Sequence, residues 1–125
     1  MADQPNLAPE ILLVEDEPLI AMYIEDSLVR SGFTVSGPFE TVVSGSDAAR
    51  RFNGAAALVD LLLDGDDATI VTEILASRNI PFVVMTGRDA VDASPAARSA
   101  PMLKKPFLIG DLLGAIRDVC ADRVG

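Results

Sequence analysis

The chain has 125 residues, of which 50% are hydrophobic, and its 10 basic and 19 acidic residues leave a net charge of −9. This length predicts one domain whose core needs no disulfide or metal ion to stabilise it. The negative charge argues against direct binding of nucleic acid, and the absence of histidine excludes triads with a histidine base, zinc sites built on imidazole and phosphohistidine chemistry on this chain.

The N-terminus and the cysteine content predict in which cellular compartment the protein resides. The first residues have neither the basic start nor the apolar stretch of a signal peptide, and no apolar run approaches the roughly 18 residues of a membrane span. Cys120 is the single cysteine, which excludes an internal disulfide and favours a reducing environment. We therefore expect a cytoplasmic protein without membrane insertion, with a flexible arm over residues 1–8 and one domain over residues 9–125.

In the first half of the chain, apolar runs alternate with helical patterns. Ile11–Val14 is continuously apolar, which is typical of a strand covered on both faces. Pro18 then marks the start of a helix whose apolar residues recur every four positions up to Val29. The next expected elements are a strand over Phe33–Ser36, which Gly37-Pro38 ends, and a helix over Thr41–Phe52.

The second half continues the alternation. Ala56–Val59 predicts a third buried strand, which ends at Asp60 and precedes a polar loop over Leu61–Asp67. Residues 88–99 are small, polar and interrupted by a proline, so a helix there is expected to be short or mobile. The remaining expected elements are a helix over Ala68–Ser77, strands over Ile80–Met85 and Pro101–Leu103, and a helix over Ile109–Ala121. Strands and helices that alternate in this way predict a parallel sheet covered by helices on both faces.

Polar side chains follow four of the five predicted strands. Because the carboxyl ends of parallel strands meet at one edge of a sheet, these side chains should lie close together. Neighbouring carboxylates repel one another unless a cation such as Mg²⁺ offsets their charge, and a lysine or a hydroxyl can donate to a phosphoryl oxygen. The pattern therefore favours an aspartate that accepts a phosphoryl group with the help of Mg²⁺. The residues are Glu15 and Asp16 after the first strand, Asp60 after the third, Thr86 after the fourth, and Lys104 and Lys105 after the fifth.

These residues, in this order, resemble the receiver domain of bacterial two-component response regulators, and the resemblance extends over about Glu10 to Ala121. It implies an α/β, flavodoxin-like, doubly wound sheet of five parallel strands in the order 2-1-3-4-5. It also implies that Asp60 is the phosphoacceptor and that Thr86 and Lys105 contact the phosphoryl group. Lys105 is preferred to its neighbour because it directly precedes a proline. The implied Mg²⁺ ligands are Glu15, Asp16, Asp60 and the backbone carbonyl of Leu62.

Two further segments refine the resemblance. Pro81–Gly87 is similar to the Pro-Phe-x-Phe-Ala-Thr-Gly stretch of a stand-alone receiver subfamily found with histidine kinases of the HWE and related types, although Val84 and Met85 replace Phe and Ala. Met102 lies three residues before Lys105, where many receivers have an aromatic ring that reports phosphorylation. An aromatic switch at that position is therefore absent.

The resemblance implies a signalling module that promotes only its own phosphorylation and dephosphorylation and is not otherwise an enzyme. Its partners would be a sensor histidine kinase and a histidine phosphotransfer protein or another protein target, which it would engage by protein–protein contact without an attached output domain. One alternative is a Mg²⁺-dependent phosphohydrolase with an aspartyl nucleophile, but such enzymes usually place an acid where this chain has Leu62. The other is a receiver-like binding module that works without phosphate, which Met102 leaves open.

Overall fold

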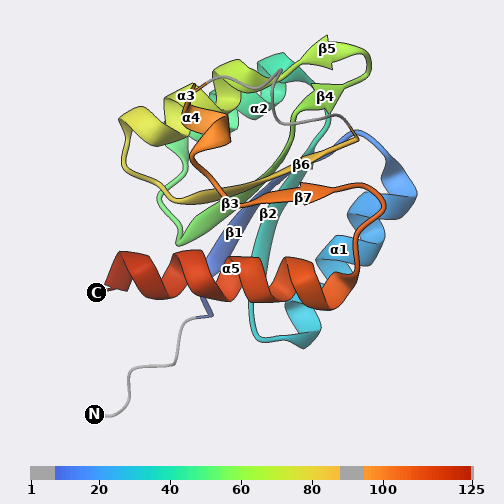
Figure 1. The fold of residues 1–125 in the computed structure, drawn as a ribbon, viewed down its shortest axis with the longest axis vertical. Helices are drawn as coiled ribbons and strands as arrows, with labels where there is room; N and C mark the ends of the chain where they lie inside the picture. The colour runs from blue at the N-terminus through green and yellow to red at the C-terminus, as the bar shows by residue number, and fades with distance from the viewer. Residues whose placement is uncertain (1–7, 88–94, 125) are drawn as a thin grey trace.

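A computed structural model describes residues 8–87 and 95–124 and consists of a five-stranded parallel sheet between two layers of helices. The strand order is β2-β1-β3-β6-β7, which is the expected doubly wound order once a small added hairpin, β4-β5, is left out. Helices α1 and α5 cover one face of the sheet, and α2, α3 and α4 cover the other (Figure 1). Most of the expected arm over residues 1–8, and residues 88–94 of the ambiguous segment, lie outside the described residues.

The helices and strands follow the sequence pattern closely. The first helix is an example, since Pro18 occupies its first turn and its buried residues Ala21, Ile24 and Leu28 recur at helical spacing. The bounds in chain order are β1 Glu10–Val14, α1 Pro18–Arg30, β2 Thr34–Phe39, α2 Val42–Arg51, β3 Ala56–Asp60, β4 Leu62–Leu63, β5 Asp66–Asp67, α3 Thr69–Ser77, β6 Phe82–Thr86, α4 Pro95–Arg98, β7 Met102–Lys104 and α5 Ile109–Val124.

The core consists of two apolar clusters, one on each face of the sheet. Side chains alternate between the faces along a strand, so Leu12 packs with α2 and α3 while Leu13 packs with α1 and α5. Strands β1, β3 and β6 lie in the middle of the sheet, and every residue of β3 and β6 is buried. These strands must be apolar on both faces, which explains why they appear in the sequence as continuous apolar runs. The packing of β1, β3 and β6 therefore fixes the positions of the polar residues at the ends of these strands.

The prediction that Gly37-Pro38 ends the second strand was wrong, because β2 continues to Phe39. Leu12 pairs with Ser36 and Val14 pairs with Phe39, so β2 has one extra residue at this point and forms a bulge. Proline is tolerated because β2 is an edge strand. Gly37 has a φ of +125°, and a Cβ atom there would overlap the carbonyl oxygen of Leu13. The bulge brings Phe39 next to the site, where its carbonyl accepts a hydrogen bond from the Glu15 N–H at 3.0 Å.

The segment predicted as a polar loop, Leu61–Asp67, instead contains the antiparallel hairpin β4-β5. Its turn residues Asp64 and Gly65 have φ values of 49° and 85°, which suit an Asp-Gly turn between two short strands. The sequence contained this turn signal, but the flanking strands have only two residues each and carry no periodic pattern.

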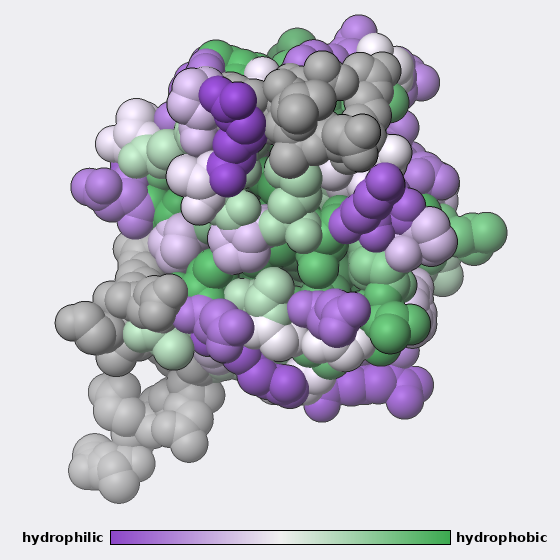
Figure 2. Space-filling view, viewed as in Figure 1, coloured by the Kyte–Doolittle hydropathy of each residue, from purple (hydrophilic) through white to green (hydrophobic). Residues whose placement is uncertain are grey.

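The sheet is only partly covered at β7. Helix α4 has only four residues, as its proline and small residues led us to expect, and Met102 and Leu103 remain half-buried. Figure 2 shows hydrophobic surface between α5 and this edge of the sheet. Within the described residues, no helix is long and apolar enough to cross a membrane.

Candidate functional site

A single ammonium group, that of Lys105, joins three carboxylates at the carboxyl edge of the sheet. Its Nζ atom lies 2.7 Å from Asp60 Oδ2, 3.0 Å from Glu15 Oε1 and 3.3 Å from Glu17 Oε1. Three segments that are far apart in sequence therefore meet at one atom. They meet because β1, β3 and β7 run parallel and end at the same edge, as the strand order requires.

Asp60 is the last residue of β3, the central strand, and only 3% of its surface is exposed. Oδ1 of its carboxylate accepts a hydrogen bond from the backbone N–H of Leu62 at 3.0 Å, and Oδ2 accepts from Lys105. The chain turns away directly after Asp60, where the Leu61 N–H still donates to the carbonyl of Met85 in the neighbouring strand. Both carboxylate oxygens are thus oriented before any ligand binds.

Asp16 is held by the added hairpin. Its Oδ2 atom accepts a hydrogen bond of 2.7 Å from the backbone N–H of Asp64, at the turn between β4 and β5. An ionised acceptor makes this one of the stronger kinds of hydrogen bond. The hairpin, which the sequence did not predict, therefore fixes one of the predicted metal ligands.

Glu15 is fully buried, and its surroundings shift its pKa. Burial is the largest cause and the negative charge of Asp60 the next, and together they raise the pKa of Glu15 from 4.5 to about 7 against the opposing effects of the Glu17 N–H and Lys105. Burial alone would lower the pKa of Lys105, but its hydrogen bonds to Asp60 and Glu15 outweigh burial and raise it. Lys105 therefore stays charged at neutral pH, and it partly offsets the repulsion between the carboxylates.

The raised pKa of Glu15 predicts that stability depends on pH in metal-free buffer. Between about pH 4.5 and pH 7 the folded chain binds more protons than the unfolded chain, so this residue's contribution to the free energy of unfolding falls as pH rises, by up to about 3 kcal/mol. Urea unfolding of the wild type and a Glu15→Gln variant at several pH values measures the effect. The variant should gain stability relative to the wild type as pH rises through this window, and a constant difference would contradict the shift.

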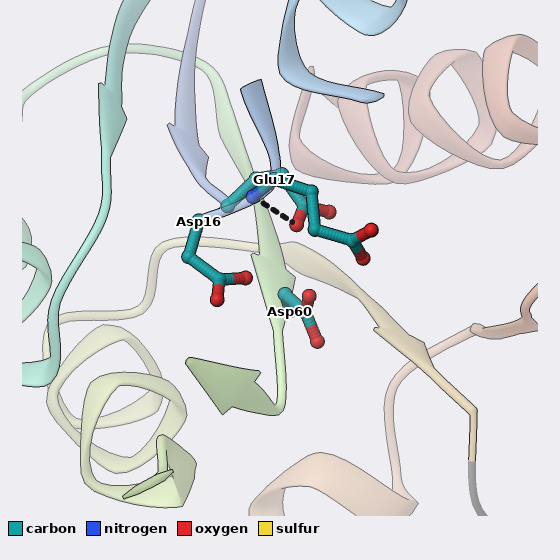
Figure 3. Close-up of side chains that lie close together, drawn as sticks. Asp16, Glu17 and Asp60 are labelled. Carbon is teal, nitrogen blue, oxygen red and sulfur yellow. Dashed lines mark hydrogen bonds between the residues drawn. The ribbon is translucent and has the colours of Figure 1, made fainter. Parts of the chain in front are cut away.

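Four carboxylates surround one space at this edge. One oxygen each from Glu15, Asp16, Glu17 and Asp60 can be chosen so that all four lie within 4.8 Å of one another. In Figure 3 the side chains of Asp16, Glu17 and Asp60 approach this space from different sides. Hard oxygen donors of this kind fit Mg²⁺, which binds through one or two carboxylates and completes its shell with water and phosphate oxygens.

The other predicted site residues lie around the same edge. Thr86 is buried at the end of β6, one residue beyond Met85, which pairs with Asp60, and its carbonyl accepts a hydrogen bond of 2.8 Å from the Lys105 N–H. Lys104 is the last residue of β7 and is exposed, whereas the next residue, Lys105, reaches the carboxylates. The predicted switch position, Met102, is half-buried in β7 and packs against the cluster that lines α2 and α3.

Glu17 is the site residue that the sequence analysis did not assign. It directly precedes Pro18, where the sequence predicts the start of a helix. In the structure Glu17 is the N-cap residue of α1, and its side chain contacts Lys105 rather than the helix N-terminus. Its backbone N–H donates to Glu15 Oε2 at 3.1 Å. An acid next to an acidic pair was the available signal, but helix starts commonly carry acids for other reasons.

Comparisons with known proteins agree in pointing to one kind of domain. The chain is 37% identical to SdrG from Sphingomonas melonis Fr1, whose solution structure superposes with a TM-score of 0.76, and the match covers 90% of this chain and 96% of that one. A crystal structure of the receiver domain of sensor histidine kinase PA1611 from Pseudomonas aeruginosa PAO1, with magnesium coordinated in its active site cleft, has 25% identity, a TM-score of 0.76 and coverage of 91% and 98%.

Longer proteins are related to this chain as well. It is 32% identical over 112 residues to the transcriptional regulatory protein PdtaR of Mycobacterium tuberculosis, which covers 85% of this chain and 54% of that protein. The chain spans about half the length of the curated relatives that it matches. No protein-family model matches it.

Proposed function

Since this chain belongs to the receiver domain family of response regulators, we propose that Asp60 accepts a phosphoryl group from the phosphohistidine of a sensor histidine kinase. The observation that carries this proposal is the position of the Asp60 carboxylate. It is nearly buried, one oxygen is held by the Leu62 N–H and the other by the Lys105 ammonium group, and further carboxylates lie beside it. This is the arrangement of an oriented nucleophile beside a cation that can stabilise phosphoryl charge.

Asp60, Lys105 and Thr86 have different roles in the proposed phosphoryl transfer. An oxygen of Asp60 forms the new bond to phosphorus, the bond between phosphorus and the donor imidazole breaks, and the electron pair of that bond stays on the imidazole nitrogen. Lys105 donates to the phosphoryl oxygens, and the Thr86 hydroxyl at the end of β6 is the second donor. Their role is positioning and charge stabilisation, which is the main protein contribution to phosphoryl transfer.

Mg²⁺ is the cofactor that we assign to the carboxylate cluster. When bound, it offsets the negative charge of the carboxylates and of the phosphoryl group. We assign Asp16 and Asp60 as direct ligands, Glu15 as an assisting residue, and the carbonyl of Leu62 as the backbone ligand. The presence of magnesium in the related PA1611 receiver domain supports this assignment.

The signal would be passed on by protein contact. Exposed apolar residues on α1 and in the turn after β7 offer such a surface, namely Leu19, Met22, Tyr23 and Leu108. We further assign the chain to the stand-alone subfamily that works with kinases of the HWE type, with a histidine phosphotransfer protein or another protein as the next partner. That assignment depends on the sequence of Pro81–Gly87. The charge of −9 argues against direct nucleic-acid contact by this domain.

The test is intact-mass analysis after incubation with phosphoramidate and Mg²⁺. The wild type should gain the mass of one phosphoryl group, and a sample treated with a chelator should gain none. An absence of adduct at every donor concentration would contradict the proposal. Continuous hydrolysis of small phosphate esters without an adduct would instead indicate a phosphohydrolase.

A further inference from the structure

Glu17 contacts the ammonium group on which the proposed chemistry depends. Its Oε1 atom lies 3.3 Å from Lys105 Nζ, the longest of the three ion pairs at that nitrogen. The side chain makes no hydrogen bond that caps α1, although Glu17 is the N-cap residue. The contact with Lys105 therefore does not follow from a role in starting the helix.

The hydrogen-bonding capacity of Lys105 is fully used by carboxylates. An ammonium group has three N–H donors and no acceptor. Three carboxylate oxygens, one each from Glu15, Glu17 and Asp60, lie within bonding distance of them. Once Asp60 is phosphorylated, its negative charge lies on the phosphoryl oxygens, and the donor that Asp60 uses now passes to one of them. A second phosphoryl oxygen can accept a hydrogen bond from Lys105 only after Glu15 or Glu17 has given up its contact.

Burial decides which contact is given up. The side chain of Glu15 is 0% exposed, so it would lose a cation without gaining water. The side chain of Glu17 is 57% exposed and can turn into solvent at little cost. Of these two carboxylates, Glu17 is thus the one that water can satisfy.

We propose that Glu17 is a displaceable positioning residue, whose carboxylate occupies the Lys105 donor that the phosphoryl group takes over. The proposal rests on the function proposed above. In the unphosphorylated chain Glu17 holds Lys105 and opposes phosphorylation. Phosphorylation releases its carboxylate at a groove of about 360 Å³ that Glu17 and Lys105 line together with apolar residues. The other lining residues are Ile20, Tyr23, Pro106 and Phe107.

The first measurement is the rate of adduct formation with phosphoramidate and Mg²⁺. Glu17→Ala should be phosphorylated about two- to five-fold faster than the wild type, the factor that corresponds to losing one partly exposed ion pair. The matched control is Glu40→Ala, which removes the same charge from an exposed residue directly after β2, at the same edge of the sheet. Glu17→Gln keeps an acceptor oxygen and should give an intermediate rate.

A second measurement needs neither donor nor metal. Lys104 and Lys105 are the only lysines, so selective ¹⁵N labelling yields two side-chain signals. The ammonium protons of Lys105 should exchange with water faster in Glu17→Ala than in Glu40→Ala. This measurement reports the contact itself, whether or not the domain accepts phosphate.

The outcomes separate the two proposals. If the wild type forms an adduct but Glu17→Ala reacts no faster than Glu40→Ala, the role of Glu17 is wrong and the proposed function stands. A slower reaction of Glu17→Ala would also overturn it, because Glu17 would then assist phosphorylation, for example as a metal ligand. If no variant forms an adduct, the proposed function fails, and the exchange rates show separately whether Glu17 holds Lys105.

Discussion

The Asp60→Asn variant should take up no phosphoryl group from phosphoramidate in the presence of Mg²⁺. An amide oxygen is not a nucleophile of carboxylate strength, so the acceptor is lost even though the side chain keeps its size. Asparagine keeps the size of the side chain and one acceptor oxygen, which can still accept from Lys105 or from the Leu62 N–H, the two donors that now hold separate carboxylate oxygens at 2.7 and 3.0 Å. The fold should therefore persist. Intact-mass analysis measures the loss of phosphorylation, and a thermal unfolding curve measures whether the fold is kept.

The control for Asp60→Asn is Asp66→Asn. Asp66 is an exposed acid in the β4-β5 hairpin, so this variant loses the same charge near the site while the proposed acceptor is untouched. It should form the adduct as the wild type does. An adduct on Asp60→Asn at the wild-type level would mean that another carboxylate is the acceptor, and peptide mapping would then locate it.

The Lys105→Met variant should lose about 2 to 3 kcal/mol of unfolding free energy near pH 8 in metal-free buffer. Removing the partner of a buried charge costs more than the pair contributes, because the remaining charge is left in a poorly hydrated place. The remaining charge here is that of buried Glu15. Once the ammonium group is gone, nothing on Lys105 offsets its repulsion by the negative charge of Asp60. Urea unfolding measures the loss.

The same variant should lose less stability near pH 5. Lys105 lowers the pKa of Glu15, so its removal raises that pKa further, and Glu15 then folds in its neutral form at acidic pH. Lys104→Met, a change of the exposed neighbour, is the control and should have little effect at either pH. Equal losses at both pH values would contradict the electrostatic explanation.

Most of the architecture could be predicted because its signals are local. A buried parallel strand needs apolar residues on both faces. Continuous apolar runs such as Ile11–Val14 and Ala56–Val59 therefore predict such strands from the local sequence alone. The prediction of the second strand stopped early because Gly37-Pro38 is a turn signal when read alone. It is a bulge here only because β2 is an edge strand whose register shifts against β1.

The hairpin at Leu62–Asp67 was missed for a related reason. Strands of two residues are too short to carry a periodic pattern, so only the Asp-Gly turn was visible. Its effect on the site also depends on tertiary structure, because the hydrogen bond from the Asp64 N–H to Asp16 joins residues 48 positions apart.

The sequence by itself determined which chemical groups lie at the carboxyl edge of the sheet. Residues at the ends of parallel strands or directly after them, such as Glu15, Asp60 and Lys105, must meet there once the strands pair in parallel. Only the tertiary structure decided how these groups pair. Glu17 and Asp16 are acidic neighbours in the sequence, yet Glu17 accepts a hydrogen bond from Lys105 and Asp16 accepts one from the Asp64 N–H of the hairpin. The two differ because the chain at the start of α1 turns their side chains in different directions (Figure 3).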